Sequence, residues 1–216
     1  MRGLVRRTPK DKIIDRFLTL YVLTKASKQT QKLGKTQLQK IMFLSEWRMI
    51  SQKMKGLNYN YIKFEFGPYS PELQEDMDRF AKLGATRSST LKPTDKGFNI
   101  IDDFASVIEA NKPFFAILDR YTRSCTSVEL QDLLDKVYAL RHPIRRNMTI
   151  EETPLKTPLL YPIDESKAEE TFAINKNDLE DLAMSLDQKI VKMIEEGMAD
   201  LKTGRMVSHK ELFGSV

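Results

Sequence analysis

Two stretches of the sequence carry the clearest structural signals: KTQLQKIMFLSEWRMI at residues 35–50 and FEFGPYSPEL at residues 64–73. In the first stretch, apolar residues recur at helical spacing as far as Met54, and their stripe is wide. This pattern predicts a central helix that is buried on more than one side. In residues 59–66, aromatic residues alternate with polar ones, which predicts a β-strand.

Turn and capping residues follow the predicted strand. Gly67-Pro68 is expected to break it, and Ser70-Pro71 is expected to cap and begin a helix. That helix should end at Gly84, where glycine can adopt the left-handed conformation. Working outward towards the N-terminus, apolar residues at helical spacing predict another helix over residues 10–26.

Further elements are expected on the C-terminal side of Gly84. They are a small hairpin or wing over residues 85–93, a helix capped by Thr94, a short helix from Pro113 to Tyr121, and a helix that begins with a capping box of Thr126 and Glu129 and ends before Pro143.

The composition changes after residue 143. Spaced prolines and scattered apolar residues predict an irregular surface connection over residues 144–174. Leucine, isoleucine and methionine at helical spacing then predict a long helix from about residue 175 to residue 203. We therefore expect a helical domain over residues 1–143, the connection, and an amphipathic arm over residues 175–216. The predicted fold class is mainly α with a small β wing: a compact, winged-helix-like domain followed by a long C-terminal helix.

Composition excludes several classes of protein. The 216 residues are 41% hydrophobic and 30% charged, as in an ordinary globular chain, and no apolar run is long enough for a membrane helix or a secretory signal. The single cysteine leaves no disulfide framework, so we expect a cytoplasmic protein without membrane association. The two histidines are far apart and the nine glycines are scattered, which excludes a histidine-based metal site and a phosphate-binding glycine loop. We expect no metal and no cofactor.

Catalytic candidates are few. Neighbouring acidic residues on one helix point in different directions and do not converge on a substrate. Cys125 precedes a predicted helix N-terminus, where a thiolate can be stabilised, but only His142 and His209 could serve as its base. We therefore expect a protein that is not an enzyme.

Charge is distributed unevenly along the chain. Residues 1–60 carry a net charge of +11 and the remainder carries −6. The basic part could contact nucleic acid, an acidic protein, or the chain's own acidic remainder. For nucleic acid, the candidate contacts are Arg6, Arg7, Lys10, Lys32 and Lys35.

The order of elements after Ser70 resembles the end of a winged-helix unit. The helix in the place of the recognition helix, residues 71–83, has a net charge of −2, which is unsuited to a groove lined with phosphates. A DNA-binding regulator that uses the basic N-terminal region therefore stands as the alternative function.

The LQK sequence at residues 38–40 followed by FGPYS at residues 66–70 resembles the SocA-like antitoxin family, known as the Panacea domain, over residues 10–143. The phenylalanine before the glycine departs from the tyrosine more usual in that family. The resemblance implies a non-enzymatic, mainly helical domain that binds a cognate protein such as a toxin. On this basis the candidate partner-binding residues of the domain are Lys40, Trp47, Phe66 and Tyr69. The plainer interpretation is that the motif residues form core, turn and cap.

The C-terminal residues 195–211 resemble the ends of several bacterial antitoxins. An amphipathic helix of this kind can lie in a partner's groove, mediate formation of a homo-oligomer, or pack on its own domain. The candidate partner-binding residues of this arm are Leu186, Ile190, Met193, Leu201, Val207 and Phe213.

Overall fold

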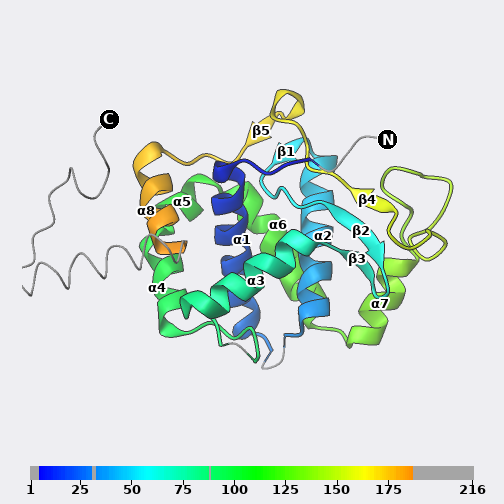
Figure 1. Cartoon of the computed structure of the whole chain (residues 1–216), viewed down its shortest axis with the longest axis horizontal. Helices are drawn as coiled ribbons and strands as arrows, with labels where there is room; N and C mark the ends of the chain where they lie inside the picture. The colour runs from blue at the N-terminus through cyan, green and yellow to red at the C-terminus, as the bar shows by residue number, and fades with distance from the viewer. Residues whose placement is uncertain (1–4, 31–32, 88, 187–216) are drawn as a thin grey trace, which may run out of the picture.

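The computed structural model describes residues 5–30, 33–87 and 89–186. The protein is mainly helical with two small sheets (Figure 1). The helices are α1 (Pro9–Ser27), α2 (Lys35–Ser51), α3 (Pro71–Leu83), α4 (Asp95–Asp103), α5 (Ala105–Ala110), α6 (Lys112–Thr126), α7 (Leu130–Tyr138), the 3₁₀ turn η1 (Glu165–Lys167) and α8 (Lys176–Leu186). The strands are β1 (Met54–Lys55), β2 (Tyr61–Phe64), β3 (Gly67–Tyr69), β4 (Pro158–Leu160) and β5 (Glu170–Thr171). None of the described helices is long and apolar enough to cross a bilayer.

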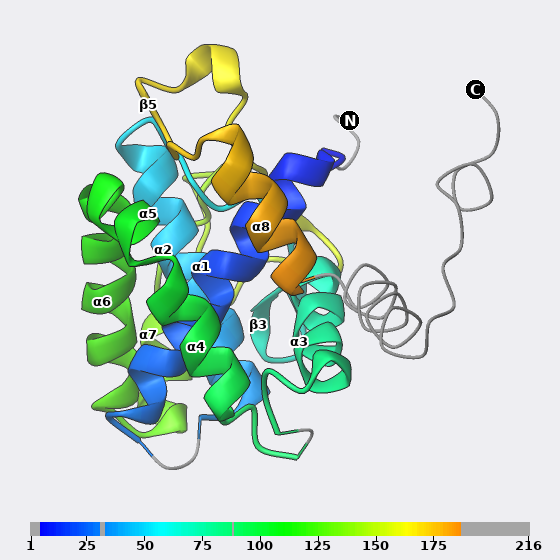
Figure 2. The ribbon, with the colours of Figure 1, turned by 90° about the vertical axis from the view of Figure 1, so that its left-hand side faces the viewer.

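Helix α1 runs through the middle of the core. Every residue from Ile13 to Thr24 is buried, and the helix packs against α4, α6 and α8 (Figure 2). Helix α2 packs against α6, α7, β1 and β3, so the prediction that it would be buried on more than one side is confirmed. The burial of α1 all round is a finding that its sequence did not predict, because Asp15 and Arg16 interrupt the apolar run and are nevertheless inside.

The predicted strand is part of a three-stranded antiparallel sheet in the order β3-β2-β4. Gly67-Pro68 does not end the sheet, as the sequence suggested, but begins β3, with Ile62 opposite Tyr69 and Phe64 opposite Gly67. The chain turns at residues 65–66, and Gly67 takes a φ of +85°, a conformation that favours glycine. The sequence signal for a break was in fact the signal for a hairpin.

Three predicted helix ends are confirmed. The Ser70 hydroxyl accepts a hydrogen bond from the Leu73 amide at 3.3 Å, and the Thr94 hydroxyl accepts one from the Gly97 amide at 3.4 Å. Gly84 ends α3 in the left-handed conformation. Among the described residues of the predicted wing between α3 and α4, an isolated bridge joins Thr86 and Pro93.

Two other predictions on the helices were wrong. Helix α6 continues to Thr126 instead of stopping at Tyr121. The capping box of Thr126 and Glu129 does not form, because the Thr126 hydroxyl donates back to the Thr122 carbonyl and α7 begins without a side-chain cap.

The segment over residues 144–174 is more ordered than the predicted irregular connection. Strand β4 pairs with β2, and β5 pairs in parallel with β1. The segment also buries Ile150, Leu159, Leu160 and Phe172. The apolar residues are scattered in sequence because each short extended piece inserts only one or two side chains into the core.

Helix α8 lies against α1, as Figure 2 shows. Leu182 and Leu186 are buried, with Leu182 fully inaccessible. The first part of the predicted C-terminal arm therefore packs on its own domain. Residues 187–203 of the predicted long helix lie outside the described residues.

Gly97 provides a test of the packing between α4 and the segment that precedes it. A Cβ at this position would lie 2.3 Å from the carbonyl oxygen of Ala85, which is backbone and cannot rotate away. Alanine normally stabilises a helix relative to glycine by about 1 kcal/mol. We expect Gly97→Ala instead to lower the melting temperature, whereas Lys96→Ala, at the exposed neighbouring position, should leave it nearly unchanged. A Gly97→Ala protein that melts at a higher temperature than wild type would contradict this packing.

Leu186 tests whether α8 belongs to the folded domain. Leu186→Glu places a carboxylate at a buried position and should lower the free energy of unfolding of the isolated protein by about 3 kcal/mol or more. Met184→Glu is the matched control, because Met184 lies on the same helix and is 37% exposed. Chemical denaturation of both variants checks this, and equal midpoints would show that α8 is not docked in solution.

Candidate functional site

The two sequence motifs contact each other directly. The carboxamide of Gln39 donates to the Ser70 carbonyl at 3.0 Å and accepts from the Ser70 amide at 2.9 Å. The ammonium of Lys40 donates to the Pro68 carbonyl at 2.8 Å. Since β3 is an edge strand, these side chains of α2 satisfy backbone groups that a neighbouring strand would otherwise occupy. They fix the β2–β3 hairpin to the helical core.

Lys40 has an unusual environment for a lysine. Its residue is only 2% exposed, and Gly67 lies beside its Cε and Nζ atoms. Burial, helped by the nearby charge of Lys63, lowers the pKa of Lys40 to about 7. Lys63 itself is buried on the same side of the sheet, with its Nζ 4.0 Å from the centre of the Tyr138 ring. This face of the hairpin is therefore packed against α2 and α7.

The opposite side of the hairpin is exposed and aromatic. Phe64 is 39% exposed and Phe66, in the turn, is 56% exposed. The rings of Phe64 and Tyr69 lie with their centres 5.3 Å apart, and Ile62 is paired with Tyr69 in the register of the sheet. We call Ile62, Phe64, Phe66 and Tyr69 the hairpin face. Figure 1 shows the hairpin at the side of the molecule opposite α8.

A buried ionic cluster lies at the other end of β2. Asp76 of α3 accepts hydrogen bonds from Arg7 at 2.8 Å, Arg16 at 2.9 Å and the Tyr59 hydroxyl at 3.1 Å. Asp15 of α1 accepts a further bond from Arg7 at 3.1 Å. Burial raises the pKa of Asp15 to about 7, and the charge of Arg7 opposes that rise. We use the name ionic cluster for Arg7, Asp15, Arg16 and Asp76.

Glu46 is a second buried acid next to this cluster. One of its oxygens accepts a bond from the Tyr59 amide at 3.2 Å, and the other has no hydrogen-bond partner. Burial raises the pKa of Glu46 well above its ordinary value, which favours the neutral acid. Glu46 therefore adds little charge to the cluster.

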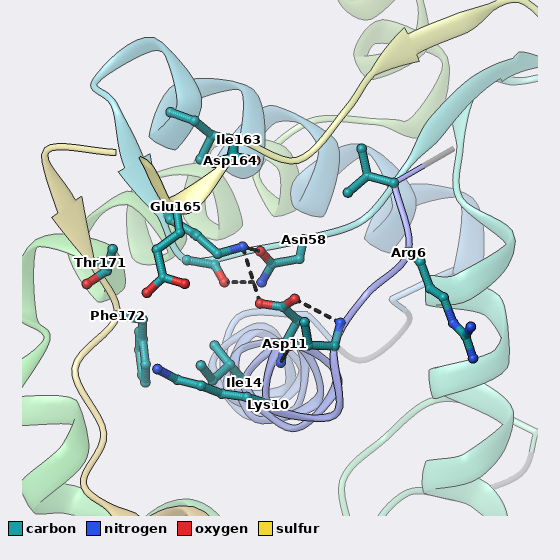
Figure 3. Close-up of a pocket in the computed structure, with 14 residues that line it drawn as sticks. Arg6, Lys10, Asp11, Ile14, Asn58, Ile163, Asp164, Glu165, Thr171 and Phe172 are labelled. Atoms are coloured by element: carbon teal, nitrogen blue, oxygen red, sulfur yellow. Dashed lines mark hydrogen bonds and ion pairs between the residues drawn. The ribbon is translucent and has the colours of Figure 1, made fainter. Parts of the chain in front are cut away.

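A cavity of about 240 Å³ opens near the N-terminus of α1 (Figure 3). Lys55 lines it and binds the carboxylate of Asp11 at 3.2 Å and the side-chain oxygen of Asn58. Glu165 points towards this group, whereas Arg6 points away from it. The cavity carries both signs of charge.

The candidate partner-binding residues fall into three groups. Phe66 and Tyr69 belong to the hairpin face. Trp47 is half-buried against Phe43, while Lys40 and Leu186 are inside the protein and present no surface to a partner in this structure. The remaining candidates lie outside the described residues: Ile190, Met193, Leu201, Val207 and Phe213.

The candidate nucleic-acid contacts are separated as well. Arg7 is buried in the ionic cluster, so its selection as a phosphate contact was wrong. Lys35 is exposed and pairs with Asp78 at 3.3 Å. Arg6 and Lys10 are exposed beside the cavity, and Lys32 lies outside the described residues.

Cys125 and His142 were considered for catalysis, and the structure shows the surroundings of each. Cys125 is buried, and burial raises the pKa of its thiol to about 12, which disfavours a thiolate. The Nδ1 atom of His142 accepts hydrogen bonds from the amides of Ile144 and Arg145 and so holds a turn. Among the described residues, no three histidine, cysteine or acidic side chains gather in a way that could hold a metal ion.

Sequence reasoning missed Phe64, Ile62 and the acids of the ionic cluster. Alternation along residues 59–66 did contain the signal for the hairpin face, since Ile62 and Phe64 occupy the positions between buried ones. Asp15 also had a signal, because it interrupts a strongly apolar helix. Its partner Asp76 had none, as it lies among other acids on α3.

Comparison with known proteins gives no relative: the chain matches no protein-family model, no curated protein and no solved structure.

The lowered pKa of Lys40 predicts that the stability of the protein depends on pH. Its pKa is about 7 in the folded protein and should be near the ordinary 10.5 in the unfolded chain. Between these values the unfolded chain binds a proton that the folded protein lacks, so stability should rise as the pH increases from 7 to 10. The contribution is at most about 1.4 kcal/mol per pH unit.

Lys40→Met should remove this contribution, and the comparison with wild type isolates it from other titrating groups. Lys35→Met, at the exposed start of the same helix, controls for the loss of a lysine. Urea denaturation at several pH values measures the slopes. Parallel curves for wild type and Lys40→Met would rule out the buried, lowered-pKa amine.

Proposed function

We propose that this protein is a non-enzymatic interaction module of antitoxin type and that its partner protein binds the hairpin face. The observation that carries the proposal is a rigidly held hairpin with an exposed aromatic side. Aromatic residues dominate the binding energy of protein interfaces when a partner removes them from water.

The rigidity of the hairpin supports this assignment. Gln39 and Lys40 fix β3 from the helical side, and the Tyr138 hydroxyl donates to the Glu65 carbonyl in the turn at 2.8 Å. A preorganised surface loses little conformational entropy on binding, so more of the contact energy appears as affinity. Phe66, at 56% exposure, is not needed to complete the core.

A further exposed apolar residue lies near the hairpin in the chain that pairs with β2. The backbone of Lys63 exchanges hydrogen bonds with Lys156 and Thr157, which brings the adjacent Leu155, 59% exposed, to the edge of β2. Exposed apolar residues that gather into a patch mark interaction sites on proteins.

The competing functions have weaker support. An enzyme with a cysteine nucleophile would need a more accessible group than Cys125. A DNA-binding regulator could not use Arg7, Arg16 or Lys40 to contact phosphates, because these side chains are buried. The antitoxin part of the proposal rests on the LQK and FGPYS motifs. Both motifs build the hairpin, so the resemblance concerns the scaffold that presents the hairpin face.

The experiment is a neutralisation assay with the products of the neighbouring genes. Each product is expressed with and without this protein, and growth of the host is measured. We expect one product to be toxic alone and tolerated with the wild-type protein. Phe64→Ser/Phe66→Ser should abolish the protection and weaken binding of that product by about thirtyfold or more, because loss of an interface hot spot costs at least about 2 kcal/mol.

Met184→Ser is the matched control, since it removes an exposed apolar side chain from α8, across the molecule from the hairpin. It should protect as well as wild type, and both variants should keep the wild-type melting temperature. Full protection by the Phe64→Ser/Phe66→Ser protein would reject the hairpin face, and the absence of any neutralised product would reject the antitoxin assignment.

A further inference from the structure

The N-terminal segment, residues 5–7, lies on the domain in the manner of a bound peptide. The amide of Val5 donates to the side-chain oxygen of Asn60 at 3.0 Å, and the Asn60 nitrogen donates to the Val5 carbonyl at 2.9 Å. Both contacts use the backbone of Val5, whose side chain is exposed. The carboxamide of Asn60 can therefore hold any residue at the position of Val5, because it binds only the backbone.

Two residues further on, the side chain of Arg7 enters the ionic cluster. One guanidinium nitrogen contacts Asp76 at 2.8 Å and Asp15 at 3.1 Å, and the guanidinium carbon lies 4.8 Å from the centre of the Tyr59 ring. Two carboxylates and an aromatic ring suit a planar cation. The residue is 8% exposed.

The walls of this pocket are held by groups other than Arg7. The second oxygen of Asp15 accepts from the amide and the side chain of Asn58, at 2.8 and 3.1 Å. The second oxygen of Asp76 accepts from Arg16, and the Tyr59 hydroxyl contacts Thr19 at 3.0 Å. Both carboxylates and the ring are thus held by contacts in addition to those with Arg7.

Asn60 is positioned in the same way. Its side-chain nitrogen also donates to Glu72 at 2.8 Å, and the other Glu72 oxygen accepts from the Ser70 hydroxyl at 2.9 Å. The carboxamide that pairs with Val5 is therefore oriented from α3 and its cap.

Residues 5–7 are separable from the helix that follows. Helix α1 is closed by its own capping box, in which Thr8 and Asp11 bond each other's backbone amides at 2.9 and 3.1 Å. Arg6 points away from the domain side of this segment (Figure 3). The side chains of Val5 and Arg6 are thus exposed, and that of Arg7 is the one in this segment that enters the domain.

We propose that Asn60, Tyr59, Asp15 and Asp76 form a binding site for an extended peptide that carries an arginine two residues after the position paired with Asn60. In the free protein, residues 5–7 of the chain fill this site. An arginine-bearing segment of a partner protein takes their place in a complex. The site is distinct from the hairpin face, so this inference does not depend on the proposed function.

Fluorescence anisotropy with a labelled peptide tests the site. The probe is GLVRRTP, the chain's own residues 3–9, and the protein is the full chain with Arg7→Ala, which vacates the pocket. We expect this variant to bind the probe at least about tenfold more tightly than wild type does, since an occupant in cis competes at a high effective concentration. Arg6→Ala is the matched control and should behave as wild type.

Specificity separates this site from general attraction of a basic peptide. GLVRKTP has the same charge as the probe and GLVRATP lacks the inward cation, and both should bind Arg7→Ala at least about tenfold more weakly than the probe does. Adding Asn60→Ala to Arg7→Ala should also weaken binding of the probe. The probe should raise the melting temperature of Arg7→Ala and leave that of Arg6→Ala unchanged.

Equal binding of the probe by Arg7→Ala and Arg6→Ala would overturn the proposal, as would equal binding of GLVRRTP and GLVRATP. Circular dichroism establishes that each variant is folded. If Arg7→Ala does not fold, the same comparison is made with Arg7→Lys, which keeps a cation in the pocket but lacks the planar fork. Binding of the probe by Arg7→Lys no tighter than by wild type would then reject the site.

Discussion

Asp76 connects parts of the chain that are far apart in sequence. Its two oxygens accept hydrogen bonds from Arg7, Arg16 and Tyr59, so the N-terminal segment, α1 and the approach to β2 are all held at one point on α3. A buried carboxylate with these partners fixes the relative positions of its neighbours, because any shift would leave a charge in the interior without compensation. The placement of α3, and with it the orientation of Asn60 and the start of the hairpin, depends on this group.

The ionic cluster joins the basic and the acidic parts of the sequence. Arg7 and Arg16 come from the basic first 60 residues, and Asp76 comes from the acidic remainder. The basic region was expected to contact nucleic acid, an acidic protein or the chain's own acidic part. At Arg7 and Arg16 the structure shows contact with the chain's own acidic part. Lys40 is a further cation withdrawn from the surface, and it binds a carbonyl rather than a carboxylate.

Sequence reasoning predicted the elements that depend on local chemistry. Helix caps at Ser70 and Thr94 and the glycine stop at Gly84 were found because each is decided by a few adjacent residues. Features that depend on distant partners were missed: β3 needs β2, β4 needs a strand nearly 100 positions earlier, and Asp15 is buried only because Arg7 and Asn58 meet it. For the candidate site, the sequence identified the motif residues but not their roles. Only the contacts show that Gln39 and Lys40 form a clamp on the hairpin backbone, whereas the ring of Phe66 is exposed.

These contacts show how one motif holds the surface to which we propose that a partner binds. Lys40 binds the Pro68 carbonyl of β3 and Gln39 binds both backbone groups of the adjoining Ser70, which protects an edge that could otherwise pair with another chain. With its edge closed and its inner side packed on α2 and α7, the hairpin has only its aromatic side to offer. A partner that binds the hairpin, as we propose, would therefore recognise side chains on the hairpin face rather than add a strand at β3. The clamp is what makes that mode of recognition the available one, because it removes strand addition at β3 while leaving Phe64 and Phe66 in water.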